Sequence, residues 1–550
     1  MSEYISFVKQ IEDSVRNNWY NNALSDYKGM SLKYSDVARR IAKLHILFEV
    51  CGVRRGDKIA ICGKNQANWG VAFLAAMTYG AVPVPILHEF TAASVHHIVN
   101  HSESRILFAG DIVWRGLNKE EMPAVEAFIG VSDFRLLAAR NEDVVNCREH
   151  LNEIFGKRYP KDFTADDLHY CTESDGEQLA VINYTSGTSG FSKGVMLPFR
   201  ALNGNLNFAK RVHPGVNSET NVVSMLPLAH MYGMMFEFLY EICKGVHVHF
   251  LTRLPSPKMI MEAFDAIKPD IIIAVPMIIE KIYKSKLLPL LTKPGMKLLL
   301  SIPVIDEMVE TRIKEELETY FGRKFKEVII GGAAFNKEAD EFFHRIKFRY
   351  TIGYGMTECA PIVTYAAWDK SKPGSCGKVV DELEARIDSS DPMNVPGEIQ
   401  LKGQNVMLGY YKNEELSAEA FTSDGWLRTG DMGVIDSDGY LFIKGRCKSM
   451  LLGPSGQNIY PEEIESALNS MPSIAESLVI EENGKLTALI FPNAEQFEGI
   501  DVKVDECMKT VVDQVNASLP NYSRIENYRI MDKEFEKTPK RSIKRFLYQK

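Results

Sequence analysis

The chain has 550 residues, which is enough for several folded units and excludes a small fold stapled by disulfides or a metal. Hydrophobic residues make up 45% and charged residues 25%, an ordinary globular composition that excludes a largely disordered chain. Lys and Arg number 64 against 72 Asp and Glu, giving a formal net charge of −8, so we expect no nucleic-acid partner.

The N-terminal part of the chain is predicted to contain neither a secretory signal nor a membrane span. Residues 1–19 mix charged and apolar side chains and lack the apolar core of a signal peptide. The longest uncharged run, 70–87, contains Gly80, Pro83 and Pro85, which would break a spanning helix, so we expect a buried helix followed by a buried strand. The nine cysteines form no CxxC pair, which favours free thiols and a cytoplasmic location.

Strand-like apolar runs alternate with helical patterns through most of the length, which is typical of an α/β protein. Five short apolar runs, each followed by Gly, Pro or polar residues, predict buried parallel strands at 58–62, 105–109, 179–183, 271–275 and 327–330. Residues 93–100 predict an amphipathic helix. Its His97 and neighbouring His101 have the spacing of metal ligands, with His96 beside them, but no third ligand is evident nearby, and we do not expect zinc.

The sequence texture changes twice in the last third of the chain. From about Pro396, short alternating segments such as 397–401 and 440–443 predict an antiparallel, barrel-like part. After Gly445 a polar stretch leads to a helix start at Pro461, and Asn483-Gly484 then predicts a hairpin between two apolar runs. We therefore expect a large domain over 1–445 and a small α+β domain over 446–550.

Residues 184–194 combine glycines and hydroxyl side chains with one lysine, Lys193, directly after the strand predicted at 179–183. Glycines let the backbone approach a phosphate closely, hydroxyl and amide groups donate to it, and the lysine supplies a counter-charge. The combination predicts a polyphosphate-binding loop, and the alternative is a solvated surface loop. It is not a Walker A loop, because Ser192 occupies the position of that motif's second glycine.

The loop resembles the phosphate-binding signature of the adenylate-forming superfamily, which includes acyl-CoA synthetases, luciferases and peptide-synthetase adenylation domains. Five further motifs follow in the family's order: Pro227-Leu228-Ala229-His230, Gly331-Gly332-Ala333-Ala334, Tyr354-Gly355-Met356-Thr357-Glu358, Thr429-Gly430-Asp431 and Gly445-Arg446-Cys447-Lys448. The resemblance implies mainly parallel sheets flanked by helices in the large domain, a β-barrel-like subdomain, and a small mobile C-terminal domain. It also implies activation of a carboxylic acid by ATP.

For the phosphates and the metal, the resemblance implies specific roles. Glu358 would supply a ligand for Mg²⁺, assisted by Thr188, and Thr357 would meet the α-phosphate. The β- and γ-phosphates would be held by the loop, through Thr185, Ser186, Gly187, Thr188, Ser189, Gly190 and Lys193.

For the nucleoside, the resemblance implies that Asp431 accepts hydrogen bonds from both ribose hydroxyls. Arg446 would lie near the ribose or the phosphates. The adenine would lie between Tyr354 and a strip of small residues, and the full set expected at this part of the site is Gly332, Ala333, Ala334, Tyr354, Gly355 and Met356.

The resemblance extends to residues outside the nucleotide site. Lys448 matches the family's hinge, about which the small domain turns between adenylation and thioester formation, and His230 matches a position of the acyl site. Near the C-terminus the family places a catalytic lysine where this chain has Ser542. Lys540 and Lys544 are close enough to replace it, and we favour Lys540 slightly.

The acid is expected to be a medium- or long-chain fatty acid, with coenzyme A as co-substrate. Residues 275–283 and 456–465 are similar to stretches of long-chain fatty acyl-CoA ligases. Two alternatives stay open: transfer of the acyl group to a separate carrier protein, and an acyl- or nucleotide-binding homologue that has lost catalysis because of Ser542. A homodimer and a peripheral membrane contact also stay open.

Overall fold

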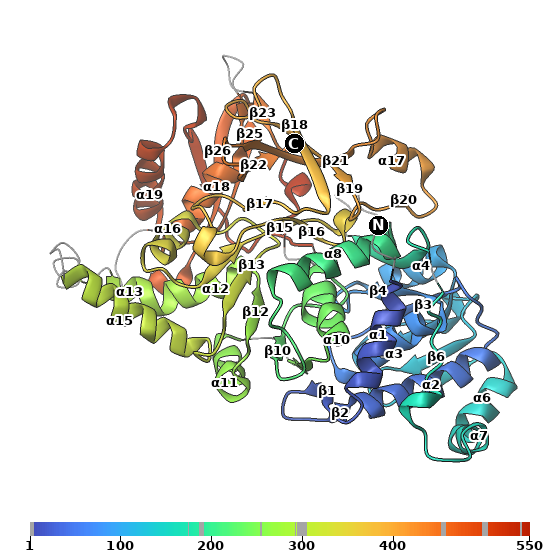
Figure 1. Cartoon of the computed structure of the whole chain (residues 1–550). Coiled ribbons are helices and arrows are strands. Elements are labelled where there is room, and N and C mark those ends of the chain that lie inside the picture. The colour runs from blue at the N-terminus through green and yellow to red at the C-terminus, as the bar shows by residue number, and fades with distance from the viewer. Residues whose placement is uncertain are drawn as a thin grey trace.

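The N-terminal part of the chain forms a mostly parallel sheet covered by helices, as the computed structural model in Figure 1 shows. The structure describes residues 5–173, 175–185, 192–252, 256–291, 293, 305–452, 458–497, 504–538 and 542–549. The sheet has the order β4-β3-β5-β6-β7, with β3 Lys58–Cys62, β4 Val82–Ile86, β5 Ser104–Ala109, β6 Ala127–Gly130 and β7 Leu136–Ala139. Its helices are α2 Tyr34–Val50, α3 Ala67–Tyr79, α4 Ala92–Ser102, α6 Glu142–Glu149 and α7 Leu151–Arg158.

The uncharged run 70–87 forms most of α3 and all of β4, which confirms the predicted buried helix and buried strand. Helix α3 is apolar on every side and is buried almost all round. Gly80, with φ of 87°, takes the left-handed conformation that ends the helix. The strands predicted at 58–62 and 105–109 are confirmed as parallel neighbours.

Two further sheets form the middle of the large domain. One has the order β10-β11-β1-β2, and the other is the parallel sheet β12-β13-β14, which confirms the strands predicted at 271–275 and 327–330. The strands are β1 Asn22–Asp26, β2 Ser31–Lys33, β10 Asn221–Ser224, β11 His247–Phe250, β12 Ile271–Ala274, β13 Glu327–Ile330 and β14 Tyr350–Ile352. The helices around them include α1 Phe7–Asn17, α8 Phe199–Val212, α9 Met231–Met234, α10 Tyr240–Cys243, α11 Pro257–Ile267, α12 Pro276–Ile282, α15 Ile305–Tyr320 and α16 Lys337–Arg345.

The strand predicted at 179–183 exists, but the prediction that it is parallel is wrong. It is part of β8 (Leu179–Thr185), which pairs antiparallel with β9 (Lys193–Pro198). Only residues 186–192 separate β8 from β9 in the chain, and so short a connection can join only antiparallel strands. A third short strand, β20 (Gly409–Tyr410), pairs antiparallel with the other edge of β9.

The segment between the middle sheets and the small domain is antiparallel, as its texture predicts. A small sheet contains β15 Tyr354–Gly355, β16 Ile362–Tyr365 and β17 Lys378–Val379. A larger sheet has the order β18-β19-β21-β22, with β18 Leu383–Asp388, β19 Gly397–Gly403, β21 Leu427–Ile435 and β22 Leu441–Arg446. The antiparallel part therefore begins before Pro396, and β18 and β22 form the two edges of the larger sheet.

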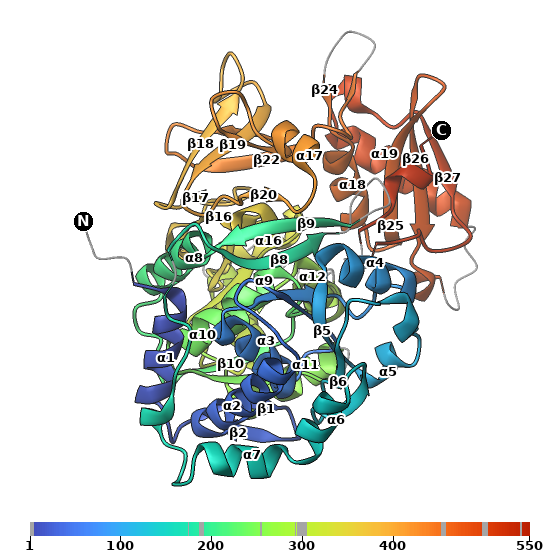
Figure 2. The ribbon, with the colours of Figure 1, turned by 90° about the vertical axis from the view of Figure 1, so that its right-hand side faces the viewer.

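The C-terminal residues form a separate α+β unit with its own core. Its elements are α18 Pro461–Ser470, β25 Ile474–Glu482, β26 Lys485–Pro492, α19 Val504–Ser518 and β27 Asn527–Ile530. The predicted hairpin is confirmed: β25 and β26 are antiparallel, and Asn483 and Gly484 have φ of 54° and 73°. Figure 2 shows this unit beside the β18 to β22 sheet, above the N-terminal sheet. Lys284 Nζ donates to the Asn469 carbonyl at 2.7 Å and joins the two domains.

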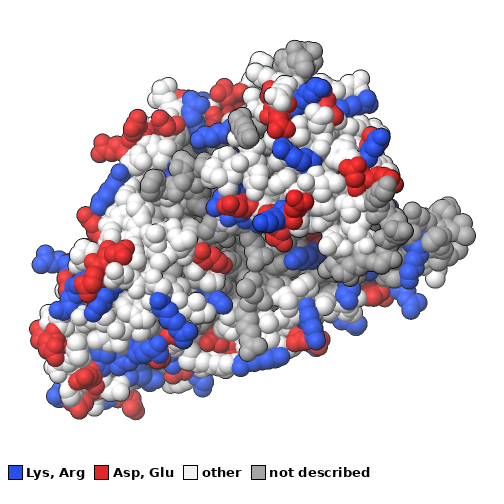
Figure 3. Space-filling model, turned by 180° about the vertical axis from the view of Figure 1, so that it is seen from behind, with Lys and Arg blue, Asp and Glu red and all other residues white. Residues whose placement is uncertain are grey.

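The surface carries both signs of charge. Figure 3 shows basic and acidic side chains intermingled over the described part of the face seen from behind. Such mixing gives no extended positive field on that face for a polyanion to follow. Among the described residues, no helix has the length and apolar character needed to cross a bilayer.

Glu237 is a fully buried carboxyl group that joins a helix to the end of β10. It lies in the π-helical turn Met235–Leu239 between α9 and α10. Its Oε2 accepts hydrogen bonds from Ser224 Oγ at 3.0 Å, Met225 N at 3.1 Å and Leu226 N at 3.0 Å. Burial raises the pKa of Glu237 from 4.5 to about 8. The folded protein therefore holds this proton at neutral pH, whereas the unfolded chain releases it.

We expect Glu237→Gln to reduce the pH dependence of stability. Between the unfolded pKa of 4.5 and the folded pKa of about 8, the folded state binds the extra proton, so this group lowers stability by about 1.4 kcal/mol per unit of rising pH. The amide keeps an oxygen acceptor and does not titrate. Calorimetric melting should show the wild-type Tm falling more steeply with rising pH than the variant's. Glu120→Gln, at an exposed position, should follow the wild type, and parallel wild-type and Glu237→Gln curves would contradict the assignment.

Candidate active site

The predicted phosphate loop connects the two strands of a hairpin. Thr185, the last residue of β8, is paired in register with Lys193, the first residue of β9. Five of the predicted phosphate-binding residues, namely Ser186, Gly187, Thr188, Ser189 and Gly190, lie outside the described residues. Their roles, including that of Thr188 at the metal, stay predictions. In the described part of the hairpin, the cation Lys193 is the first residue of β9, directly after the predicted loop.

Lys193, Tyr410 and Glu358 meet beside this hairpin. Because β20 pairs with β9, the ring of Tyr410 lies under the lysine, with Nζ of Lys193 5.3 Å from the ring centroid. The Tyr410 hydroxyl donates to Glu358 Oε1 at 3.0 Å. Burial raises the pKa of Tyr410, so its hydroxyl stays a donor. One tyrosine therefore contacts two groups of the predicted site. Its ring contacts Lys193, a cation for phosphates, and its hydroxyl binds Glu358, a carboxylate suited to a hard divalent metal.

The backbone around Glu358 is held by groups from two other elements. The 3₁₀ turn Thr357–Cys359 follows β15. Asn205 of α8 donates from Nδ2 to the Cys359 carbonyl at 3.0 Å and accepts at Oδ1 from Ile362 N at 2.9 Å. Met407 N donates to the Glu358 carbonyl at 2.8 Å. Both ends of the turn are thus fixed, which limits the motion of the Glu358 side chain.

Asp431, Arg446 and Tyr354 form a second cluster. Asp431 on β21 and Arg446 on β22 are paired in register, and Arg446 Nε lies 2.8 Å from Asp431 Oδ1. The Tyr354 hydroxyl donates to Asp431 Oδ2 at 2.6 Å. Burial raises the pKa of Asp431, while Arg446 and Tyr354 act in the opposite direction. The structure thus brings together three residues that the sequence predicts at the nucleoside.

The strip of small residues expected at the adenine follows the carboxyl end of β13. Gly332, Ala333 and Ala334 are exposed there, and Gly332 has φ of 90°. Gly355 packs against the chain so closely that a Cβ atom would lie 2.3 Å from the Pro361 carbonyl oxygen. Only glycine fits that position. Gly332, Tyr354 and Gly355 all line one cavity.

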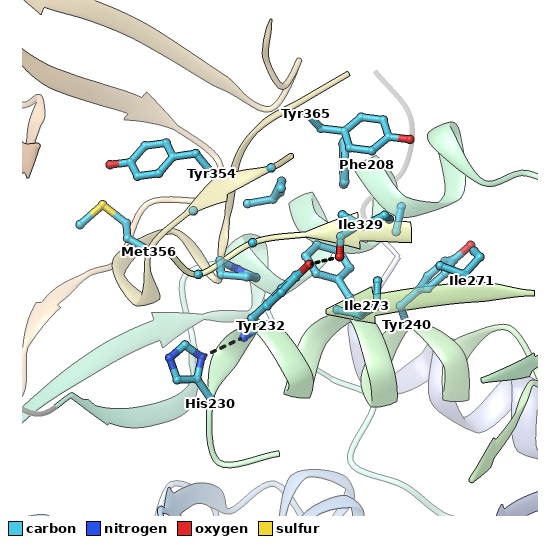
Figure 4. Close-up of a pocket in the computed structure, with 18 of the residues that line it drawn as sticks. Phe208, His230, Tyr232, Tyr240, Ile271, Ile273, Ile329, Tyr354, Met356 and Tyr365 are labelled. Carbon is cyan, nitrogen blue, oxygen red and sulfur yellow. Dashed lines mark hydrogen bonds between the residues drawn. The ribbon is translucent and has the colours of Figure 1, made fainter. Parts of the chain in front are cut away.

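A largely apolar cavity opens at these residues and runs into the large domain (Figure 4). His230, Tyr354, Met356 and Thr357 line it at the outer end. Aromatic and aliphatic side chains line its length, including Phe208, Phe236, Ile271, Ile273, Ile329 and Ile362. The cavity is therefore suited to an acyl group whose carboxylate lies at the outer end.

His230 occupies the start of helix α9. Its Nδ1 accepts from Tyr232 N at 3.5 Å, and the Tyr232 hydroxyl donates to the Ile329 carbonyl at 3.0 Å, as Figure 4 shows. This chain of contacts sets His230 and Tyr232 across the cavity from Tyr354 and Met356. The structure thus places His230 at this cavity, and its role at an acyl group stays a prediction.

The hinge and closing segments belong to the small domain or its border. Lys448 is exposed in the turn after β22, where Ser449 N and Met450 N donate to the Arg446 carbonyl. Ser542 is exposed, and its carbonyl accepts from Thr538 N at 2.8 Å. Lys544 pairs with Glu536 at 3.3 Å. Lys540 lies outside the described residues, so its role stays a prediction.

Three groups of residues in or near the site are not found by sequence reasoning. Tyr410 binds the Glu358 side chain and Asn205 binds the backbone of its turn. Both contacts join segments that are far apart in the chain, so the sequence does not reveal them. The adjacent aromatic pair Tyr410-Tyr411 is the one local signal of a site residue. The third group is His213, Tyr240 and Glu241, which line the cavity. The histidines of α4 are used structurally, since His101 Nδ1 lies 2.7 Å from the Tyr184 hydroxyl and His96 accepts from Asn118 N.

The chain belongs to the AMP-binding enzyme family. The family's main domain matches residues 11–411 and its C-terminal domain matches residues 449–550. The long-chain-fatty-acid–CoA ligase FadD15 of Mycobacterium bovis is 27% identical over 542 residues, covering 90% of this chain and 86% of its own length. The long chain acyl-CoA synthetase 3 of Arabidopsis thaliana is 27% identical over 505 residues, covering 84% and 74%.

Solved structures of similar proteins share the fold over the whole length. The anthranilate CoA ligase AuaEII in complex with anthranoyl-AMP superposes with a TM-score of 0.79 at 18% identity, covering 100% of this chain and 97% of its own. The o-succinylbenzoate CoA synthetase MenE of Bacillus subtilis, in complex with ATP and a magnesium ion, gives a TM-score of 0.74 at 20% identity, covering 98% of each chain. The fold predicted from the sequence is thereby confirmed.

We expect Tyr410→Phe to weaken the binding of ATP in the presence of Mg²⁺ by about tenfold. The variant removes a hydrogen bond to a carboxylate, which contributes about 1.5–3 kcal/mol. Glu358→Ala should weaken binding further and remove the effect of Mg²⁺. Isothermal titration with and without Mg²⁺ measures both, with Tyr411→Phe as the matched control because that ring faces Lys412. Equal Mg²⁺-dependent affinities of the wild type and Tyr410→Phe would contradict the positioning role.

Proposed function

We propose that this chain is an ATP-dependent acid:CoA ligase that acts on a medium- or long-chain fatty acid. One observation carries the proposal: the segment Tyr354–Glu358 joins two polar clusters, Lys193–Tyr410–Glu358 and Tyr354–Asp431–Arg446, and its residues Tyr354 to Thr357 line an apolar cavity. A nucleotide held by these clusters would present its α-phosphate to a carboxylate at the mouth of the cavity.

The reaction proceeds in two steps. A carboxylate oxygen attacks the α-phosphorus of ATP, the new bond gives acyl-AMP, and the bond to pyrophosphate breaks. The thiol sulfur of coenzyme A then attacks the acyl carbon, the bond to the phosphate oxygen breaks, AMP leaves, and the thiol proton is lost to solvent. The first step brings two anions together, and in the second step negative charge develops on the departing AMP, so positive groups and hydrogen-bond donors at the phosphates lower both barriers.

The chain's own groups fit these demands. Lys193 neutralises phosphate charge at the loop, Thr357 offers a hydroxyl at the cavity mouth, and Asp431 accepts from the ribose. The carboxylate of Glu358 is the hard oxygen ligand that Mg²⁺ prefers, and the metal would neutralise charge on the phosphates. The similarity to MenE bound to ATP and magnesium supports this assignment.

The fatty acid is supported by the cavity and by the relatives. The cavity is lined along its length by Phe208, Phe236, Ile273 and Ile329, which favours an aliphatic chain. The relatives named long-chain-fatty-acid–CoA ligases support the same substrate class. Transfer to a carrier protein, and binding without catalysis, are the alternatives that the first experiment separates.

That experiment measures pyrophosphate release from Mg²⁺-ATP across short, medium, long and aromatic acids, with and without coenzyme A. We expect sustained release that requires both a fatty acid and coenzyme A, with acyl-CoA as the product. Release that a carrier protein supports better than coenzyme A would favour the first alternative. Tight nucleotide binding without release for any acid would favour the second.

We propose further that the small domain, taken as 446–550, turns about Lys448 between the two steps. Lys448→Pro should slow thioester formation by about an order of magnitude or more and spare adenylation, because proline fixes the backbone at the turn. Lys448→Ala is the matched control, since it removes the charge and leaves the backbone free. Single-turnover assays measure the two steps separately, and equal slowing of both would refute the hinge.

A further inference from the structure

The inner end of the acyl cavity is polar, in contrast to its length. His213, Tyr240 and Glu241 line it there together with Ile271. In Figure 4, Tyr240 and Ile271 lie on the opposite side of the view from His230 and Met356, which mark the outer end. The Tyr240 hydroxyl donates to the His213 carbonyl at 3.1 Å and joins helix α10 to the end of α8. An acyl chain that entered from the nucleotide side and filled the cavity would meet these groups.

Glu241 is a buried carboxyl group with an unused hydrogen-bonding atom. It is 1% exposed, and its Oε2 has no hydrogen-bond partner among the described residues. Burial raises the pKa of Glu241 well above its ordinary value, and the nearby carboxyl groups of Glu237 and Asp270 act in the same direction. A carboxyl group that holds its proton can both donate and accept a hydrogen bond.

A second buried acid nearby, Glu237, has hydrogen-bond partners where Glu241 has none. One helical turn earlier, its Oε2 takes three donors from β10 and the residues after it, and it does not line the cavity. Buried polar groups in folded proteins nearly always have a partner. A carboxyl group left unpaired at the wall of a substrate cavity is explained if the substrate supplies the partner.

His213 adds a second neutral polar group at the same end. Its Nε2 is buried without a hydrogen-bond partner among the described residues and lies 3.8 Å from Glu327 Oε2. Burial lowers the pKa of His213 to about 4, so the imidazole is uncharged. Glu327 is already occupied, since it accepts from the Tyr365 hydroxyl and Trp368 N, each at 2.7 Å.

We propose that the acyl cavity selects a fatty acid whose chain carries a hydroxyl group at its far end, and that Glu241 binds this hydroxyl. The proposal rests on the proposed function and narrows its substrate class. A methyl end would leave the carboxyl group unpaired, whereas a hydroxyl can donate to it and accept from it. A site built to hydrogen-bond a hydroxyl discriminates strongly against the analogue that lacks it. An ammonium end is disfavoured, because a charged group would lose its hydration in a cavity lined largely by apolar side chains.

The test compares three acids of each chain length, from six to sixteen carbons: the plain alkanoic acid, the terminal hydroxy acid and the terminal amino acid. Pyrophosphate release in the presence of coenzyme A gives kcat/KM for each. At the best chain length we expect the wild type to prefer the hydroxy acid over the plain acid by roughly 10-fold to 100-fold. A preference for the plain or the amino acid at every length would overturn the proposal.

Variants locate the preference in the cavity. Glu241→Leu should reverse it, chiefly by raising KM for the hydroxy acid and lowering KM for the plain acid, and Glu241→Gln should retain most of it. Glu237→Gln is the matched control, a buried carboxyl group outside the cavity, and should keep the wild-type preference. An unchanged ratio in active Glu241→Leu overturns the role of Glu241. If no acid of any kind supports release by the wild type, the proposed function itself fails, which is a distinct result.

Discussion

The pairing of β9 with two partners is the interaction on which the site depends. On one edge β9 pairs with β8, which places Thr185 opposite Lys193. On the other edge it pairs with β20, which places Tyr410 against Lys193 and within reach of Glu358. Strands β9 and β20 lie about 200 residues apart in the chain. The hydrogen-bonded ladder therefore fixes Lys193 against Tyr410, whose hydroxyl binds Glu358, in a way that no local motif could.

One short segment, Tyr354–Glu358, contacts both polar clusters and lines the cavity. Tyr354 reaches outward to Asp431, Met356 and Thr357 line the cavity, and Glu358 meets Tyr410. The close packing of Gly355 on Pro361 and the two hydrogen bonds of Asn205 fix the path of this segment. Because the same backbone positions both substrates, a shift of one moves the other, and the reacting groups stay aligned.

Much of the fold and the nucleotide site follows from local sequence. The apolar runs at 58–62 and 327–330 are strands because they are buried on both faces, and Asn483-Gly484 turns because both residues accept positive φ. The direction of β8 does not follow, since an apolar run has the same pattern in parallel and antiparallel sheets. Glu241 is also invisible in sequence, because an acid inside a helical run reads as solvated until burial and the cavity wall are known.

The substitution at Ser542 is best understood through the anchoring of the closing segment. Arg545 donates to both Glu465 carboxylate oxygens, at 2.7 and 2.8 Å, and to the Val479 carbonyl at 2.7 Å. Because Glu465 lies on α18, these bonds fix the segment to the small domain. The carbonyl of Ser542 accepts from Thr538 N, and Lys544 is paired with Glu536 in the same closing segment. A lysine on this segment would therefore move together with the small domain, and Lys544 would have to release Glu536 before it could act on an acyl carboxylate.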